Sequence, residues 1–226
     1  MTEETYTLAD LQESLLAVVR HPGTPKGMTV RQLYALTWIG LGGCQPAVAL
    51  AKQMHASGPV ASRFVKSFCG LGYVKREVEA TDRRNVNICT TDAGVSYVQQ
   101  AVADRPDKVL DTLHAIIIDR DTPVDMTVSQ LCALSMVALA GKIDAGEIGR
   151  ELGMLMPAVS RFMDTFEGWG YLERQPANDA RKVLAAITET GQNYITRFQN
   201  TLTQSPAPAA TRDGPYIRRL VDRATL

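Results

Sequence analysis

The chain has 226 residues, with 24 basic and 24 acidic side chains and a formal net charge of zero. This balance excludes a uniformly basic nucleic-acid coat, although it permits a local basic patch. No apolar run approaches the roughly 18 residues that a membrane-spanning helix needs. The acidic segment 1–4 lacks the basic and apolar regions of a signal peptide, so we expect a cytoplasmic protein.

The sequence contains one pattern twice. Residues 28–36 read Met-Thr-Val-Arg-Gln-Leu-Tyr-Ala-Leu and return at 126–134 as Met-Thr-Val-Ser-Gln-Leu-Cys-Ala-Leu, an offset of 126 − 28 = 98 residues. A period of this size is a domain, because solenoid units run roughly 20–50 residues. We therefore expect two copies of one domain, over 8–105 and 106–204. The same offset relates two further pairs of segments: 59–64 with 157–162, and 70–73 with 168–171.

Hydrophobic spacing predicts the same elements in the same order in each copy. Helical periodicity marks an opening helix and three more helices, and strict alternation then marks a β-hairpin before a closing helix. In copy one these segments are 8–20, 29–41, 46–55, 59–70, the hairpin 73–89, and 92–104. In copy two they are 108–119, 127–140, 144–152, 157–168, the hairpin 171–187, and 189–203.

The last 22 residues differ from the repeats. A Pro/Ala linker at 205–210 is extended in our interpretation. The basic segment 212–226 is expected to be a weakly ordered terminus, with a short docking helix, and a homodimer contact through it, as alternatives.

Cysteine and histidine spacing gives no metal or catalytic pattern. No cysteine lies in a C-x-x-C pair and the histidines are scattered, so we expect no metal and no cofactor. No nucleophile has a plausible partner nearby in sequence, so we expect no enzyme. Unmatched cysteines are interpreted as small core or surface residues, with redox sensing as the alternative. The residues concerned are Cys44, Cys69, Cys89, Cys132, His21, His55 and His114.

The order of helices and hairpin is that of a winged helix-turn-helix, in which the fourth helix reads DNA. The motifs of both copies resemble the MarR (multiple antibiotic resistance regulator) family of bacterial transcription factors, over nearly all of residues 8–203. The specific part is D-x-R at the hairpin tip followed by T-x-x-G. The motifs are Ser-Arg-Phe at 62–64 and 160–162, Gly-Tyr-(Val/Leu)-(Lys/Glu)-Arg at 72–76 and 170–174, D-x-R at 82–84 and 179–181, and T-x-x-G at 91–94 and 188–191.

The resemblance implies a mainly α fold with small β-hairpin wings. The family usually forms homodimers whose terminal helices interlock. Two fused copies therefore predict two winged helix-turn-helix domains that form a pseudo-dimer within one chain. The resemblance also implies a small-molecule effector bound between the reading lobe and the interlocked helices. Trp38 and Met28 could line such a cleft, with ordinary core packing as the alternative.

Helical spacing assigns one face of 59–70 to DNA. Phe64, Phe68 and Leu71 are expected to pack inward, which leaves Ala61, Ser62, Arg63 and Lys66 outward, where the two cations can meet phosphates or guanine edges. Ser57 is placed to cap this helix, and arginines at a wing tip can enter a narrow minor groove. The candidate DNA-binding residues are Ser57, Ser62, Arg63, Lys66, Lys75, Arg76, Arg83, Arg84, Ser160, Arg161, Arg174, Arg181 and Lys182.

The copies differ in charge. Residues 52–86 carry seven basic and three acidic side chains, a net charge of 7 − 3 = +4, while residues 150–184 carry five of each, a net charge of zero. Asp164 stands in the position of Lys66, and Glu173 in that of Lys75. Because phosphate neutralisation supplies non-specific affinity, we expect copy one to bind DNA more tightly.

These observations favour a repressor-like, sequence-specific regulator that binds double-stranded DNA and reads an imperfect inverted repeat with two recognition helices and two wings. One alternative is a winged-helix scaffold that binds protein, which the neutral total charge and the acidic substitutions in copy two support. Another is a plasmid or phage replication or partition protein, since these also use tandem winged helices.

Overall fold

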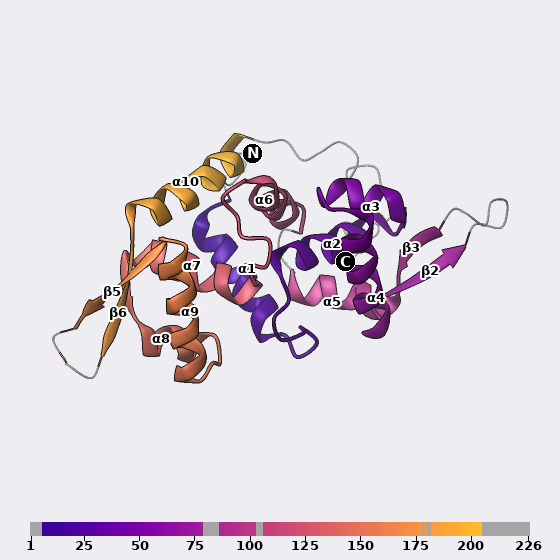
Figure 1. The fold of residues 1–226 in the computed structure, drawn as a ribbon. Coiled ribbons are helices and arrows are strands. Elements are labelled where there is room, and N and C mark those ends of the chain that lie inside the picture. Colours follow the sequence, from indigo (N-terminus) through magenta and orange to yellow (C-terminus); the bar gives the residue numbers. More distant parts are fainter. Residues whose placement is uncertain (1–5, 79–85, 103–105, 178, 180–181, 205–226) are drawn as a thin grey trace, which may run out of the picture. The chain divides into compact units, whose positions relative to one another are not determined.

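The computed structural model describes residues 6–78, 86–102, 106–177, 179 and 182–204 (Figure 1). The wing-tip residues Arg83, Arg84 and Arg181 and the tail 205–226 lie outside them. The elements are α1 (Leu8–Arg20), α2 (Val30–Gly42), β1 (Cys44–Pro46), α3 (Ala47–Gln53), α4 (Gly58–Gly70), β2 (Val74–Val78), β3 (Val86–Thr90), α5 (Asp92–Ala101), α6 (Pro106–Ile118), α7 (Val128–Ala140), β4 (Lys142–Asp144), α8 (Ala145–Glu151), α9 (Met156–Gly168), β5 (Leu172–Pro176), β6 (Val183–Ile187) and α10 (Glu189–Gln204).

The described chain is mainly helical with two small antiparallel sheets, and the predicted helices and hairpins are present within a few residues of their expected bounds. The series α2-β1-α3-α4-β2-β3-α5 recurs in kind as α7-β4-α8-α9-β5-β6-α10. The strand orders are β1-β3-β2 and β4-β6-β5. The strands β1 and β4 were not predicted, because three residues are too few to show an alternating pattern. No helix in the described part of the chain combines the length and apolar character needed to cross a bilayer.

The T-x-x-G motif fixes the closing helix against the start of the wing. The Thr91 hydroxyl donates to the Gly72 carbonyl at 2.6 Å and accepts from the Gly94 backbone N–H at 3.1 Å. A Cβ on Gly94 would lie 2.0 Å from the Tyr73 carbonyl oxygen, so a side chain at this position would force the backbone to move. The second motif, 188–191, repeats all three features. The motif is therefore a packing requirement of the wing.

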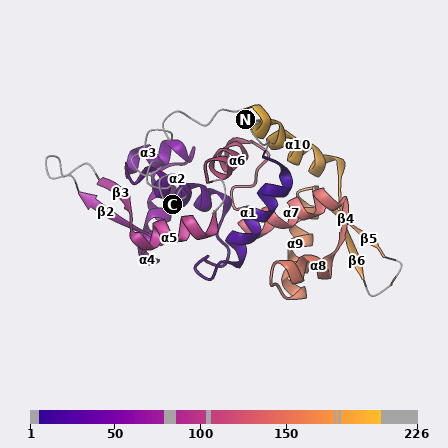
Figure 2. The same ribbon diagram turned by 180° about the vertical axis from the view of Figure 1, so that it is seen from behind.

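The chain forms two compact units that do not follow the two sequence repeats. One unit contains residues 6–29 together with 125–204, and the other contains residues 30–124. The opening helix of each repeat therefore belongs to the unit built mainly from the other repeat. Helix α1 packs on α7, and α6 packs on α2 (Figures 1 and 2). The ranges 8–105 and 106–204 describe the sequence repeat but not the compact units.

Burial of an apolar stripe explains why each opening helix packs in the unit built mainly from the other repeat. Leu11, Leu15 and Val18 form one stripe of α1 and are fully buried. The equivalent stripe of α6 is buried to the same degree, with Leu113 and Ile116 wholly inaccessible to solvent. Burial of a leucine-sized side chain contributes about 1.5–3 kcal/mol. Each stripe therefore supplies several kcal/mol that are lost if the helix leaves its unit.

Polar contacts set the register of α1 in its unit. The Arg20 guanidinium donates to a Glu151 carboxylate oxygen at 2.6 Å and to the Glu151 carbonyl at 3.1 Å. Both side chains are about half exposed, so this ion pair stabilises only modestly. The Val128 N–H donates to the Met28 carbonyl at 2.9 Å, and Thr29 forms a β-bridge with Thr127. Thr29 and Thr127 occupy equivalent positions of the two repeats.

Because each opening helix packs in the unit built mainly from the other repeat, a substitution that shortens one of its buried side chains should destabilise that unit. Leu15→Ala should loosen the unit that contains α7, and Leu113→Ala the unit that contains α2, because each leaves a cavity that costs about 2–5 kcal/mol. Hydrogen exchange measured by mass spectrometry should become faster in 125–204 for the first variant and in 30–124 for the second. The two variants are matched controls for each other. Faster exchange in the α2 peptides of Leu15→Ala would show that α1 packs on its own repeat.

Candidate nucleic-acid interface

Helices α4 and α9, which are predicted to read DNA, bury equivalent stripes. Ala61, Val65 and Phe68 are buried in α4, and their counterparts Val159, Met163 and Phe166 are buried in α9. Ser62, Arg63 and Lys66 are exposed, as predicted, and so are Ser160 and Arg161.

Two predictions about the phase of α4 were wrong. Ala61 is only 3% exposed, whereas it was expected to face outward. Leu71 is 41% exposed, whereas it was expected to pack inward. The reason is that Leu71 is the C-cap residue, beyond the last helical turn, so helical spacing no longer sets its direction. The buried stripe instead runs through Ala61 and Val65, and Phe64 lies half-buried at its edge.

Ser57 holds the N-cap position of α4, but its side chain makes no capping hydrogen bond. Its backbone carbonyl accepts from the N–H groups of Val60 and Ala61. The equivalent N-cap of α9 is Leu155, which is 80% exposed, and the next residue, Met156, is 52% exposed. The exposure of these two apolar side chains was not predicted, because it depends on where the helix begins.

The hairpins β2–β3 and β5–β6 are held to α4 and α9 by different contacts. In the second repeat, Arg174 on β5 donates to the carboxylates of Glu167 and Asp164, the latter at 2.6 Å, and to the Ser160 carbonyl at 3.0 Å. Glu167 also accepts the backbone N–H of Arg174 at 3.0 Å. Two carboxylates therefore compensate the Arg174 charge and hold β5 against α9.

The first repeat has the same arginine without those carboxylates. Arg76 on β2 reaches the Ser62 carbonyl at 3.5 Å. The positions of Asp164 and Glu167 are taken by Lys66 and Cys69, and neither side chain can compensate the charge of Arg76. The α4 surface next to β2 is consequently more positive than the matching α9 surface.

The remaining candidate DNA-binding lysines, Lys75 and Lys182, differ in whether an ion pair within the described residues already compensates their charge. Lys75 on β2 forms an ion pair with Glu77 at 2.7 Å, and the hydrogen bond to Glu77 raises the pKa of Lys75. Its charge is therefore partly compensated. Lys182, beside the tip of the second wing, is exposed.

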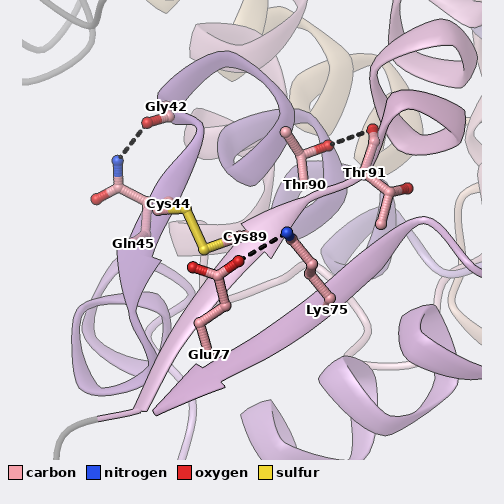
Figure 3. The surroundings of a disulfide bond; sticks show 8 residues. All are labelled: Gly42, Cys44, Gln45, Lys75, Glu77, Cys89, Thr90 and Thr91. Carbon is pink, nitrogen blue, oxygen red and sulfur yellow. Dashed lines mark hydrogen bonds and ion pairs between the residues drawn. A yellow bond between two sulfur atoms is a disulfide. The ribbon is translucent and has the colours of Figure 1, made fainter. Parts of the chain in front are cut away.

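A disulfide joins Cys44 and Cys89, which the sequence analysis had treated as unmatched (Figure 3). They are direct partners across the antiparallel pair β1–β3. Since the cysteines are separated by 45 residues and β1 was not predicted, no spacing motif pointed to this bond. Lys142 and Ala186 are partners at the equivalent place in the second repeat.

The burial of the two free cysteines agrees with their interpretation as small core or surface residues. Cys69 is half-buried and Cys132 is buried against α1, where its sulfur lies 3.9 Å from the Gln12 carbonyl. Burial raises the pKa of the Cys132 thiol to about 12, so this thiol is unreactive near neutral pH.

A small titratable cluster lies in the unit that contains α2. The ring of His114 on α6 lies 5.6 Å from that of Tyr34 and 5.8 Å from that of His55. Burial, and then the nearby charge of His55, lower the pKa of His114, so it is neutral near neutral pH. Burial also raises the pKa of Tyr34. Met28 and Trp38, considered above for an effector cleft, are buried as core packing predicts.

One segment of the chain matches a protein-family model, and several known proteins are similar to parts of the chain. Residues 124–182, from just before α7 to the tip of the second hairpin, match the model of the MarR family. An uncharacterized HTH-type transcriptional regulator of Mycobacterium leprae (strain TN) is 28% identical over 101 residues, which cover 45% of this chain and 69% of that protein.

Three solved structures are similar to parts of the chain. Wild-type MarR from E. coli in its apo form is 24% identical, with 45% of this chain and 68% of MarR covered and a TM-score of 0.33. RV1404 from Mycobacterium tuberculosis is 22% identical, with 52% and 82% covered and a TM-score of 0.37. NadR, solved in complex with 4-hydroxyphenylacetate, is 18% identical, with 40% of this chain but only 60% of NadR covered and a TM-score of 0.31.

Proposed function

We propose that this chain is a MarR-type transcriptional regulator of the cytoplasm that binds double-stranded DNA and is not an enzyme. The observation that carries the proposal is the exposed Ser-Arg pair on each reading helix, Ser62-Arg63 on α4 and Ser160-Arg161 on α9, each beside a β-hairpin wing. A small residue next to an arginine lets a helix approach the major groove while the guanidinium meets a phosphate or guanine. The match of residues 124–182 to the MarR family supports the same function.

The proposal extends to a pseudo-dimer within one chain that reads an imperfect inverted repeat. The exchange of α1 and α6 supports it, because each unit needs a helix from the other repeat. The Thr29–Thr127 bridge supports it too, since contact between equivalent residues is what a two-fold axis generates. In such an arrangement, two reading helices meet major grooves roughly 34–36 Å apart.

The two repeats contribute unequally to the affinity for DNA. Arg76, Lys66 and Arg63 give the first repeat an uncompensated positive surface for phosphates. In the second repeat, Asp164 and Glu167 compensate Arg174, which leaves Arg161 and Lys182 to face DNA. The second half-site should therefore contribute less to affinity.

A protein-binding scaffold is the competing proposal. It is favoured by the exposed apolar pair Leu155-Met156 at the start of α9, where the first repeat has Ser57-Gly58. The same apolar side chains suit contact with thymine methyl groups in a major groove. Direct measurement of DNA binding separates the two proposals.

The regulator proposal predicts tight, salt-dependent binding to duplex DNA. Six or more phosphate contacts should cost on the order of a thousandfold in affinity between about 50 and 200 mM salt. Fluorescence anisotropy with the full chain and a pool of random duplexes measures this. Absence of binding at the lowest salt concentration would overturn the regulator proposal and favour the scaffold.

A reciprocal charge exchange tests the division between repeats. Lys66→Asp should weaken DNA binding, and Asp164→Lys should strengthen it, because the second variant adds a cation and frees Arg174 from one carboxylate. Each change of one phosphate contact should alter the slope of log affinity against log salt by about 0.9.

The matched controls are Lys26→Asp and Glu13→Lys, which make the same changes of charge at exposed positions outside both reading helices. If the control variants change affinity as much as the exchange variants do, total charge governs binding and the assignment of α4 and α9 is wrong.

A further inference from the structure

We propose that the Cys44–Cys89 disulfide is a reversible redox switch that controls the affinity of the first wing for DNA. The inference rests on the proposed function, because the switch acts on that same DNA-binding wing. The disulfide joins β1, which directly follows α2, to β3, the returning strand of the wing. Only the first repeat, whose reading surface is the more positive, carries the cysteine pair.

The position of the bond connects it to the wing's base. By register, Cys44, Cys89 and Lys75 form one row across β1, β3 and β2. Next to this row, the Thr90 N–H donates to the Gly43 carbonyl at 3.2 Å. The disulfide therefore adds a covalent link where the hairpin meets the end of α2, and its loss leaves only non-covalent contacts there.

The sheet does not need this bond in order to form. The second repeat builds the same strand order with the same register, and there Lys142 and Ala186 stand opposite each other. The backbone Ile187 N–H donates to the Gly141 carbonyl at 3.1 Å, just as Thr90 donates to Gly43. The sheet of the first repeat should therefore persist when its disulfide is reduced, which a reversible switch requires.

The two cysteines differ in solvent exposure. Cys44 is exposed, whereas Cys89 is 1% exposed. Figure 3 shows the disulfide, the Glu77 carboxylate and the Lys75 ammonium together on one face of the sheet. In the reducing cytoplasm, where we place the protein, disulfides are usually transient and serve catalysis or redox sensing.

The chemistry is thiol–disulfide exchange with a low-molecular-weight disulfide, RSSR. The exposed Cys44 thiolate attacks one sulfur of RSSR, forms a mixed disulfide and releases RS⁻. The Cys89 thiolate then attacks the Cys44 sulfur and releases the second RS⁻. The two cysteines lose two protons and two electrons, and RSSR becomes two RSH. Reduction by a thiol reverses these steps, beginning with attack at Cys44.

The oxidised protein should bind DNA more tightly. A wing that is fixed before binding loses less conformational entropy when it meets DNA. We expect reduction of the disulfide to weaken DNA binding on the order of tenfold. The loss of one side chain that contacts a DNA groove changes affinity by a similar factor.

The test uses the full chain, reduced with dithiothreitol or reoxidised with oxidised glutathione, each then separated from the small thiols. All buffers contain EDTA, because Cys44, Cys89 and Glu77 bring three possible metal ligands within 4.8 Å of one another. Thiol titration in denaturant should find two thiols in the oxidised protein and four in the reduced protein. DNA affinity and hydrogen exchange are then measured on both forms.

Two variants sharpen the experiment. Cys44→Ser combined with Cys89→Ala removes the disulfide without adding a charge. This variant should fold, bind DNA like the reduced wild type and keep the same affinity after treatment with an oxidant. Cys69→Ser removes a free cysteine and should respond to redox state as the wild type does.

The outcomes separate the two proposals. Reduction should speed hydrogen exchange in 44–46 and 86–90 but not in 142–144 and 183–187. If this difference is present but neither form binds DNA, the regulator proposal fails and the proposed control of DNA binding fails with it. Equal affinity of the two forms, or a disulfide that resists reduction in the folded protein, overturns the switch and leaves the regulator proposal standing.

Discussion

Burial of the two opening helices is the interaction on which the architecture depends. Each helix carries an apolar stripe that is fully buried in a unit built mainly from the other repeat. The chain crosses between the units after α1 and again after α6. Neither repeat therefore has a complete core of its own, and both reading helices belong to one folded chain. The DNA-binding function that we propose uses this covalent coupling in place of the association of two chains.

The two repeats share the same backbone requirements, whereas their surface charges differ. Gly94 and Gly191 each leave room for a tyrosine carbonyl that a Cβ would approach within 2.0–2.2 Å, so neither tolerates a side chain without movement of the backbone. By contrast, Lys66 and its counterpart Asp164 point to solvent, where either charge is compatible with the fold. This difference in constraint allows one wing to keep an uncompensated arginine while the other pins its arginine with two carboxylates.

The features that the sequence predicted are those encoded by residues close together in the chain, and the features that it did not predict depend on contacts between distant segments. Helices and hairpins were predicted well because periodicity is a property of neighbouring residues, and T-x-x-G marked the start of the closing helix. Periodicity also showed that α1 has an apolar stripe, but it does not state which helix buries the stripe. The resemblance implied interlocked terminal helices without naming α7 as the partner of α1. The disulfide was missed because it depends on β1, a strand of three residues. The phase of α4 failed at Leu71 because the helix had already ended.

The central claim is that one chain supplies both halves of a DNA reader. The most direct measurement is the stoichiometry of the complex between the full chain and its selected duplex, by sedimentation velocity at concentrations well above the dissociation constant. A complex of one chain and one duplex, whose footprint contains both halves of the inverted repeat, is the predicted result. Two chains on each duplex, with one half-site protected by each chain, would contradict the claim.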